Sequence, residues 1–444
     1  MKFNFSLIIN RGKIPGAKKC QVEVVFGKGR NSKRIFMRLR GVIDLAAASS
    51  VINFVDRFVY EHLTGYLEGL CDCSWIGGGR RTFLTSVKNM DEVMVEVDGS
   101  HGEGGGQIIR NAVAYACLLR RKLRVTNIRA GRPNPGLASQ HLESILALLR
   151  LTQASSPSRL AKGVTEFELD GTCVHGKKDG VYTTVDLKTA GSTSLCIQCI
   201  LPYLLTLTSP SQIRIIGGTH VLKAPNFDYL SRIFVPTMNR FLNYNIDIRM
   251  DRPGYFPRGG GVLKLFVNRE DGKSPTFNHF SLIERGNLVE VHAILNLTPK
   301  LASRTNEFCN KISADTRNIE VRTVSYASVE YYLIFDKSYV GFYYLAEGRN
   351  PSASDVYTGI DYVKNRLECF LKSSAVVDEF MQDQLIMYMA LAKFYNPEGS
   401  SEMYTGPLTD HTTSAIHVSN LFLQHKCSFV VTPIDNGNTF SVKV

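Results

Sequence analysis

The sequence has no hydrophobic run long enough to cross a membrane. A transmembrane helix needs about 18 consecutive apolar residues, and the longest candidate runs are interrupted by Gln198 or by Asp383 and Gln384. The ten cysteines show no regular spacing that would indicate a disulfide framework. These absences exclude a membrane protein and a small disulfide-stapled domain. We therefore expect a soluble intracellular protein of the nucleus (nucleoplasm) or the cytoplasm, with no membrane partner.

The common phosphate-binding motifs are also missing. A Walker-type loop ending at residues 272–274 would need glycine at position 267, which is Val267. The Gly-rich residues 102–106 begin like a dinucleotide fingerprint, but Gln107 replaces its third glycine. Residues 177–180 match the Lys-x-Asp-Gly pattern of ligases that carry adenylate on lysine, although a plain hairpin turn explains them better.

Positive charge is concentrated in the first fifth of the chain. The net charge is +12, yet residues 1–89 hold fifteen Lys and Arg against six Asp and Glu, whereas residues 90–444 hold 37 against 34. The overall charge therefore says little about what the main body binds. Residues 1–89 are interpreted as a basic N-terminal extension of unknown role. A mitochondrial-type presequence, which is also basic and poor in acids, stays open.

Beyond residue 90 the chain alternates between strand and helix patterns. Runs of period two alternate with runs that place apolar residues at i, i+3 and i+4, and Gly-rich turns lie between them. This alternation predicts an α/β (α+β) fold with helices packed on layered sheets. Residues 281–371 carry strands and helices of their own, which predicts a separate module. The helices expected in the main body span residues 106–119, 140–151, 192–207, 230–242, 376–394 and 412–423.

The Gly-rich segment around Glu103 is the most informative part of the sequence. Four glycines surround this carboxylate and lead into a helix, so backbone N–H groups can approach an anion closely. Glu103 is suited to hold a divalent cation that bridges phosphate oxygens. Gln107 and Arg110, three residues apart, share one helix face and point to the same mouth. Taken alone, the segment fits a Gly-rich turn with a solvated glutamate equally well.

Three further segments carry polar side chains suited to chemistry. A stiff Pro/Gly turn presents Arg132, whose planar guanidinium suits a phosphate monoester, and a new helix follows it. Asp383 interrupts an apolar helix, where a carboxylate needs a partner such as an adenine amino group or an arginine. His411 begins a helix, whose dipole would lower the pKa of the imidazole. A lone histidine is more often structural. Asp410 could instead raise that pKa or orient the ring.

Together these segments resemble the RNA 3′-terminal phosphate cyclase family, over about four-fifths of the chain. The resemblance implies a large domain, residues 90–280 and 372–444, of three repeated α/β units, and a small inserted α/β domain, residues 281–371. It implies ATP-dependent conversion of an RNA 3′-phosphate to a 2′,3′-cyclic phosphodiester through a covalent histidine–AMP and an RNA–adenylate anhydride. The matching segments are residues 98–110, 129–142, 188–192, 217–229, 254–261, 383–385 and 411–412.

The resemblance also assigns roles to residues of this chain. His411 is the nucleophile, and Mg²⁺ or Mn²⁺ binds at Glu103. The remaining catalytic residues are Arg110 and Arg132. RNA 3′-phosphate ends are bound by Arg132, Gln140 and His141. The ATP pocket is lined by Gln107, Gln198, Pro225, Phe380, Asp383 and Gln384, with Phe380 in a place where the family commonly has tyrosine.

Two alternatives belong to other functional classes, and the oligomeric state stays open. Some relatives of the fold are non-catalytic factors of ribosome assembly and pre-rRNA processing. Enolpyruvyl-type transferases share the repeated unit but need no nucleophilic histidine. The combination of Glu103, Arg110 and His411 favours the true cyclase branch, because each residue has a role in the same chemistry.

Overall fold

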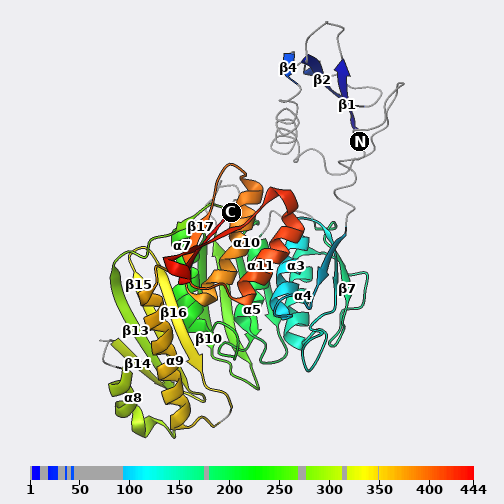
Figure 1. Cartoon of the computed structure of the whole chain (residues 1–444). Coiled ribbons are helices and arrows are strands. Elements are labelled where there is room, and N and C mark those ends of the chain that lie inside the picture. The colour runs from blue at the N-terminus through cyan, green and yellow to red at the C-terminus, as the bar shows by residue number, and fades with distance from the viewer. Residues whose placement is uncertain are drawn as a thin grey trace. The chain divides into compact units, whose positions relative to one another are not determined.

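The chain divides into two compact units, residues 1–84 and 85–444. The computed structural model describes residues 94–444 except 175–179, 269–276, 313–317 and 349, together with four strands near the N-terminus. Lys177 therefore lies outside the described residues. In the first unit, β2 pairs antiparallel with the other three strands (Figure 1). The strands are β1 (Phe3–Asn10), β2 (Lys19–Lys28), β3 (Phe36–Met37) and β4 (Val42–Asp44).

Three sheets of the second unit share one strand order. Their orders are β5-β6-β7, β8-β9-β11-β10 and β12-β17-β19-β18. In each sheet the first pair is parallel and the next pair antiparallel. An isolated bridge from Ser155 to Asp170 takes the place of a fourth strand in the first sheet. The strands are β5 (Val95–Asp98), β6 (Lys122–Thr126), β7 (Phe167–Asp170), β8 (Tyr182–Asp186), β9 (Ser211–Gly217), β10 (Asn245–Arg252), β11 (Gly261–Asn268), β12 (Ser281–Leu282), β17 (Glu402–Thr405), β18 (Val430–Ile434) and β19 (Thr439–Lys443).

The helices of these three units lie close to where the sequence pattern predicts them, and the α/β class is confirmed. Each unit has the chain order strand, helix, strand, helix before its antiparallel strands. In the repeat that contains β8 and β9, the second helix is broken into α6, a short π-helical stretch (Leu230–Phe234) and α7. The helices are α3 (Gly106–Leu118), α4 (Ser139–Thr152), α5 (Thr193–Leu204), α6 (Phe227–Tyr229), α7 (Val235–Leu242), α10 (Glu379–Tyr395) and α11 (Asp410–Leu423).

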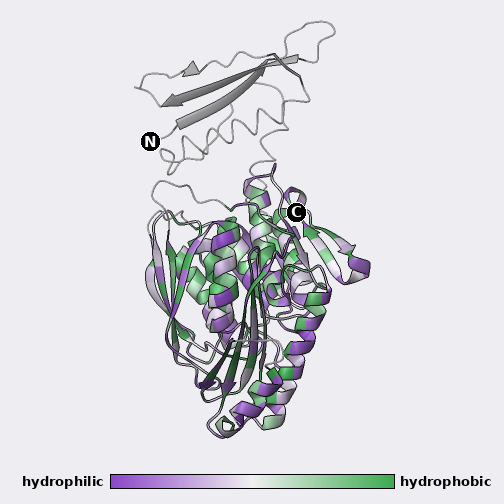
Figure 2. Cartoon of the chain, turned by 90° about the vertical axis from the view of Figure 1, so that its left-hand side faces the viewer, coloured by the Kyte–Doolittle hydropathy of each residue, from purple (hydrophilic) through white to green (hydrophobic). Residues whose placement is uncertain are grey.

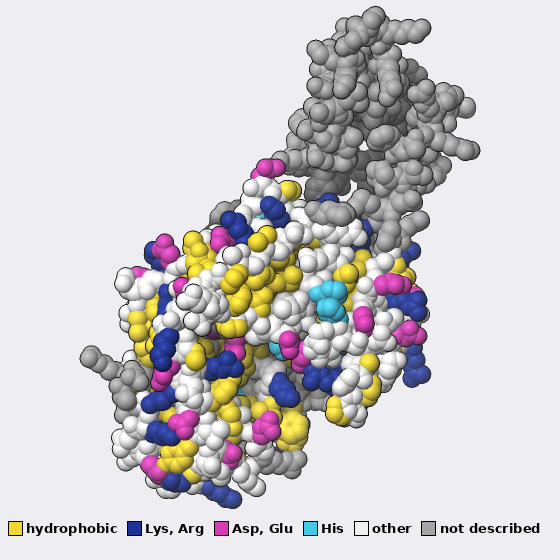
Figure 3. Space-filling model, viewed as in Figure 1, with side chains coloured by type: hydrophobic (Ala, Val, Ile, Leu, Met, Phe, Trp, Pro, Cys, Tyr) yellow, Lys and Arg dark blue, Asp and Glu magenta, His cyan; other side chains and the backbone are white. Residues whose placement is uncertain are grey.

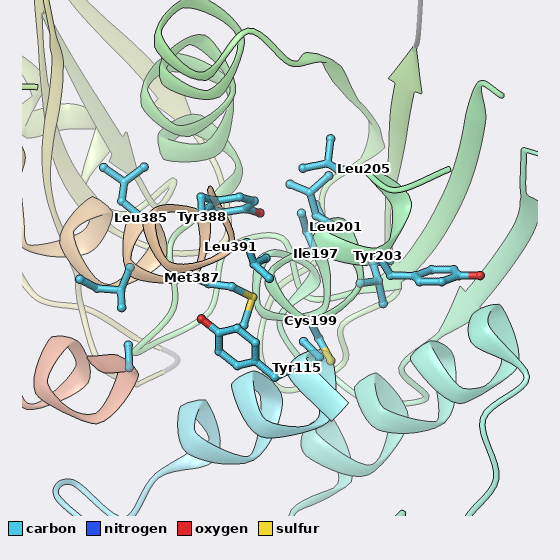
Figure 4. Close-up of a cluster of buried hydrophobic side chains, with 14 of the residues drawn as sticks. Tyr115, Ile197, Cys199, Leu201, Tyr203, Leu205, Leu385, Met387, Tyr388 and Leu391 are labelled. Carbon is cyan, nitrogen blue, oxygen red and sulfur yellow. The ribbon is translucent and has the colours of Figure 1, made fainter. Parts of the chain in front are cut away.

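The core of the main body lies where α3, α5 and α10 meet. Figure 4 shows Tyr115 of α3, Ile197 of α5 and Leu391 of α10 within one cluster of apolar side chains. Helices α5 and α10 are apolar on nearly every face, which is typical of helices buried in the core. The Tyr115 hydroxyl forms a 2.8 Å hydrogen bond with the Ser419 hydroxyl of α11. In Figure 2, green hydrophobic residues alternate with purple hydrophilic ones along the helices and strands of the main body.

A fourth sheet, between β12 and α10 in the sequence, has its own hydrophobic core. Its order is β14-β13-β15-β16, and α8 and α9 belong to the same segment. Since β12 precedes this segment and pairs with β17 after it, the third sheet is assembled across the insertion. The elements are β13 (Leu288–Leu297), α8 (Thr305–Ile312), β14 (Asn318–Thr323), β15 (Ser328–Phe335), β16 (Tyr339–Leu345) and α9 (Ala353–Lys372).

The surface of the second unit carries charges of both signs. On the face shown in Figure 3, basic and acidic side chains are intermixed, in keeping with the small net charge of residues 90–444. Within the described part of the chain, no helix combines the length and apolar character needed to cross a membrane.

Candidate active site

The Gly-rich loop between β5 and α3 approaches two other helices so closely that side chains would not fit. Gly102 has a φ of +60°, and a Cβ placed on it would lie 2.6 Å from the Ser414 hydroxyl of α11. A Cβ on Gly106 would overlap the His141 imidazole of α4 and lie 2.8 Å from a terminal nitrogen of Arg110. Glycine is therefore required here to bring the loop against both α11 and α4.

Two segments that are distant in the sequence converge on the carboxylate of Glu103. Its Oε2 atom lies 2.9 Å from Nδ1 of His411. Its Oε1 atom accepts a hydrogen bond from Nη2 of Arg132, which also donates to the Glu103 backbone oxygen at 3.0 Å. The hydrogen bond from His411, helped by Arg132, lowers the pKa of Glu103 to about 2 against the opposing effect of burial. The glutamate is therefore a fixed anion and not a solvated side chain.

The sequence led us to expect a lowered pKa for His411, and the structure corrects this. The pKa of His411 is raised, mainly because Nδ1 donates a hydrogen bond to Glu103, although burial opposes the shift. The Glu103 carboxylate outweighs both burial and the positive charge of Arg110, and the partner is Glu103 rather than Asp410. With Nδ1–H held by Glu103, the lone pair of the neutral imidazole is on Nε2.

Gln382, which the sequence analysis passed over, fixes the start of α11. This fully buried side chain of α10 accepts hydrogen bonds from the Thr409 backbone N–H at 2.9 Å and from the Thr412 hydroxyl. Its amide nitrogen donates to the Thr405 hydroxyl at 2.7 Å. Because Thr409 caps α11, one amide holds the helix that carries His411. The sequence did hold a signal for Gln382, because it is a third polar residue next to Asp383 and Gln384 in an otherwise apolar helix.

One pocket contains four of the six residues assigned to ATP. Gln107 of α3 donates to Asp383 of α10, and burial raises the pKa of Asp383 to about 6. Asn111 also lines this pocket, and its spacing of four from Gln107 could have predicted it. The lining residues are Gln107, Asn111, Gln198, Pro202, Phe234, Asp383, Gln384, Met387 and Tyr388.

Pro225 and Phe380 do not line that pocket. The Phe380 ring stacks on Tyr343 of β16, with centroids 4.6 Å apart, and meets Tyr229 edge-on at 5.6 Å. Pro225 is half-buried in the loop between β9 and α6. The structure thus places Phe380 against the inserted segment, where two aromatic rings already pack on it.

Several buried polar atoms around the site have no hydrogen-bond partner within the described residues. They include Oε1 of Gln107, Oε1 of Gln384 and Nε of Arg110. Buried polar atoms are normally satisfied, so orphaned acceptors in a pocket indicate a missing ligand. The two amide oxygens can accept N–H groups of a base, and Arg110 can meet an anion. These residues fit a nucleotide.

Two of the residues assigned to RNA, Arg132 and His141, lie against the Gly-rich loop. His141 is buried, and burial, together with Arg110 and Arg129, lowers its pKa to about 3. It is therefore a neutral imidazole at physiological pH. Gln140, its neighbour in the sequence, is half-buried and packs against Gly191. Arg132, nine residues earlier, is half-buried and donates to the Glu103 backbone oxygen.

The side chains present do not form a metal site by themselves. Both oxygens of Glu103 are already bound to cationic or N–H groups. Within the described residues, no three His, Cys, Asp or Glu side chains come together as possible ligands. Mg²⁺ prefers several oxygen ligands in octahedral geometry, so Glu103 alone does not provide its site.

A comparison of the sequence with known proteins identifies the family of the chain. A family model described as RNA 3′-terminal phosphate cyclase matches residues 101–429, a span that holds the Gly-rich loop, the pocket and His411. The chain belongs to the RNA 3′-terminal phosphate cyclase family. This is a family of enzymes.

Relatives in the family come from archaea and eukaryotes. An RNA 3′-terminal phosphate cyclase of Pyrobaculum aerophilum is 34% identical over 75% of this chain and 94% of its own length. An RNA 3′-terminal phosphate cyclase of Drosophila melanogaster is 30% identical over 77% of this chain and 94% of its own. A probable RNA 3′-terminal phosphate cyclase of Dictyostelium discoideum is 30% identical over 77% of this chain and 79% of its own length.

Replacing Glu103 with glutamine should lower the pKa of His411. The amide can still accept the Nδ1–H bond, but the negative charge that raises this pKa is gone, while burial and Arg110 continue to lower it. A pH titration followed by NMR of histidine ¹³Cε1 signals measures the change, with His411→Asn identifying the resonance. An unchanged or higher pKa in Glu103→Gln would contradict the assigned cause.

Proposed function

We propose that the chain catalyses the ATP-dependent conversion of RNA 3′-phosphate ends to 2′,3′-cyclic phosphodiesters. The observation that carries this proposal is the 2.9 Å contact between Nδ1 of His411 and Glu103. It orients the imidazole so that Nε2 is the free nucleophile, close to a pocket suited to a nucleotide. The nuclear or cytoplasmic location stays a prediction.

In the proposed first step, Nε2 of His411 attacks the α-phosphorus of ATP. A nitrogen–phosphorus bond forms, the bond to the pyrophosphate oxygen breaks, and pyrophosphate leaves with its electron pair. The imidazole becomes positively charged in this step, and Glu103, already hydrogen-bonded to Nδ1, stabilises that charge. Arg110 supplies a positive charge beside the phosphates. The side chains of Gln107, Asp383 and Gln384 hold the base.

In the second step, an oxygen of the RNA 3′-phosphate attacks the phosphorus of the histidine–AMP. His411 leaves as a neutral imidazole, and an RNA–adenylate anhydride forms. The 2′-hydroxyl then attacks the terminal phosphorus of the RNA, losing its proton to solvent, and AMP departs. Activation is needed because a phosphate monoester is a poor electrophile until it has a good leaving group. In this proposal Arg132 and His141 bind the RNA phosphate.

We propose that ATP reaches the site with Mg²⁺ or Mn²⁺, whose ligands come chiefly from the ATP phosphates. Glu103 could add one oxygen only by giving up part of its contact with Arg132 or His411. No step above depends on such an ion.

The non-catalytic ribosome-assembly branch is the alternative function, and it predicts no covalent adenylate at all.

The test is to incubate the protein with α-labelled ATP and Mg²⁺ and look for covalently bound label. A phosphoramidate on histidine is labile to acid and stable to base, which distinguishes it from a phosphoester. Addition of an RNA oligonucleotide with a 3′-phosphate should release the label and yield a cyclic end, whereas a 3′-hydroxyl oligonucleotide should not. Absence of label with both Mg²⁺ and Mn²⁺ would overturn the proposal in favour of the non-catalytic branch.

An Arg132→Ala variant should separate the two halves of this reaction. The contact between Glu103 and His411 does not need Arg132, so self-adenylation should continue. Transfer to a 3′-phosphorylated oligonucleotide should fall about ten- to a hundredfold, because a charged contact to phosphate is lost. Single-turnover measurements of each step give the answer. If self-adenylation fell as steeply as transfer, Arg132 would act on ATP.

A further inference from the structure

Three loops meet at one end of the sheet β8-β9-β11-β10, outside the site described so far. The backbone N–H of Gly218 donates to the carbonyl of Gly191 at 2.8 Å, and that of Thr219 donates to the carbonyl of Gly254 at 2.8 Å. These bonds fix the loops to one another, so they form one surface. The loops are residues 186–192, 217–226 and 252–261.

This three-loop surface continues directly into the candidate active site. Gly191 packs so closely on α4 that a Cβ placed on it would lie 3.1 Å from Cβ of Gln140. One turn further along α4, Oε1 of Glu143 forms an ion pair with Nζ of Lys188 at 3.1 Å. His141, the neighbour of Gln140, is packed against Gly106. The loop that carries Gly191 and Lys188 therefore packs directly on the helix that carries Gln140 and His141.

An aromatic ring stands at the tip of the third loop. Phe256 is 71% exposed, and its ring contacts no other described aromatic ring. The turn beneath it is fixed: Gly259 donates to the carbonyl of Tyr255 at 2.7 Å, and Arg252 donates to the carbonyl of Gly260 at 2.9 Å. The Tyr255 ring is anchored 4.6 Å from that of Tyr326. A well-held turn thus presents one free aromatic face.

Cationic side chains lie on the same loops as this ring, and Arg258 is two residues from Phe256 in the sequence. Arg252, Arg258 and Lys223 are exposed, and no carboxylate among the described residues pairs with Arg258 or Lys223. The acidic side chains nearby are already engaged. Asp186 accepts from the Lys188 backbone N–H, and Asp251 pairs with Lys264 at 2.8 Å. The surface therefore offers unpaired positive charge beside an exposed ring.

We propose that this surface binds the RNA strand upstream of its 3′-phosphate, with a base stacked on Phe256 and backbone phosphates on Arg258 and Lys223. The RNA assignment rests on the proposed function. An aromatic face accepts any base, and cations that follow a strand bind its backbone without regard to sequence. Contacts on this surface add to those at the 3′-end and strengthen the binding of long RNA.

The test measures binding directly, with a fluorescent RNA of about ten nucleotides that ends in a 3′-phosphate, because strand-binding surfaces cover about that length. Phe256→Ala should weaken binding in fluorescence anisotropy about fivefold or more. Arg258→Ala should weaken it and also reduce the dependence of affinity on salt concentration. Tyr182→Ala is the matched control, since Tyr182 is 72% exposed at the opposite end of the same sheet and should leave binding unchanged.

The length of the RNA gives the second measurement. Binding of a 3′-phosphorylated dinucleotide should be weakened less by Phe256→Ala than binding of the long RNA, because in this proposal the ring binds the strand upstream of the 3′-phosphate. Equal binding of the long RNA by both proteins, or equal losses in Phe256→Ala and Tyr182→Ala, would overturn the inference. Weakened binding by Phe256→Ala in a protein that forms no adenylate would instead uphold this surface and reject the proposed reaction.

Discussion

A His411→Ala variant should form no covalent adenylate and should lose cyclisation by about a thousandfold or more, as expected when a nucleophile is removed. The Gln382 amide holds the start of α11, the helix that carries this imidazole, and Glu103 orients the ring. ATP should still bind, because the pocket residues on α3 and α10 are unchanged. Labelling with α-labelled ATP and equilibrium binding of ATP measure the two properties separately.

His417→Ala is the matched control for this variant. His417 lies on the same helix, and its ring stacks on that of His101 with centroids 3.7 Å apart, so it is engaged elsewhere. Lys177→Ala is a second control, because the Lys177 motif would carry adenylate in a lysine-type ligase. Both should keep the label. Loss of label in Lys177→Ala with label retained in His411→Ala would place the nucleophile on the lysine.

Gly106→Ala should reduce cyclisation about a hundredfold or more while leaving the chain folded. The added methyl group would overlap the His141 imidazole and press on Arg110, and both side chains are buried with little room to move. Displacing catalytic groups by about an ångström is enough for a loss of this size. The steady-state rate with a 3′-phosphorylated oligonucleotide measures it, and circular dichroism checks the fold.

Gly131→Ala is the control for this steric effect. Gly131 lies in the turn that presents Arg132, but a Cβ placed on it meets no atom within 4 Å. The same chemical change should therefore be nearly silent there. If Gly106→Ala kept full activity, His141 and Arg110 would not need their observed positions, and the packing of the Gly-rich loop against α4 would have no role in the reaction.

Local patterns revealed the frame of this site but not its internal bonding. The Gly-rich turn before α3 is visible because glycine, strand periodicity and helix periodicity follow one another in a short segment. Asp383 stands out because a carboxylate in an apolar helix needs a partner. The identity of that partner, Gln107, depends on how α3 and α10 pack. Contacts between residues that are distant in the sequence leave no local signal.

The chemistry of His411 illustrates the same limit. Its place at a helix start is local, and from this the sequence predicts a lowered pKa. The opposite shift arises from Glu103, which is brought to His411 only when the first and third sheets are in place. Gln382 was passed over for a similar reason, because the sequence around it does not show which backbone groups its side-chain amide binds.

The packing of α3 against α11 has a consequence for the growing polypeptide on the ribosome. Tyr115 of α3 is covered by Ser419 and Phe422 of α11, yet about 300 residues separate these partners in the order of synthesis. Until α11 emerges, the apolar face of α3 stays uncovered, and the chain lacks His411, the proposed nucleophile. A nascent chain is therefore catalytically silent and in need of protection from aggregation for most of its translation.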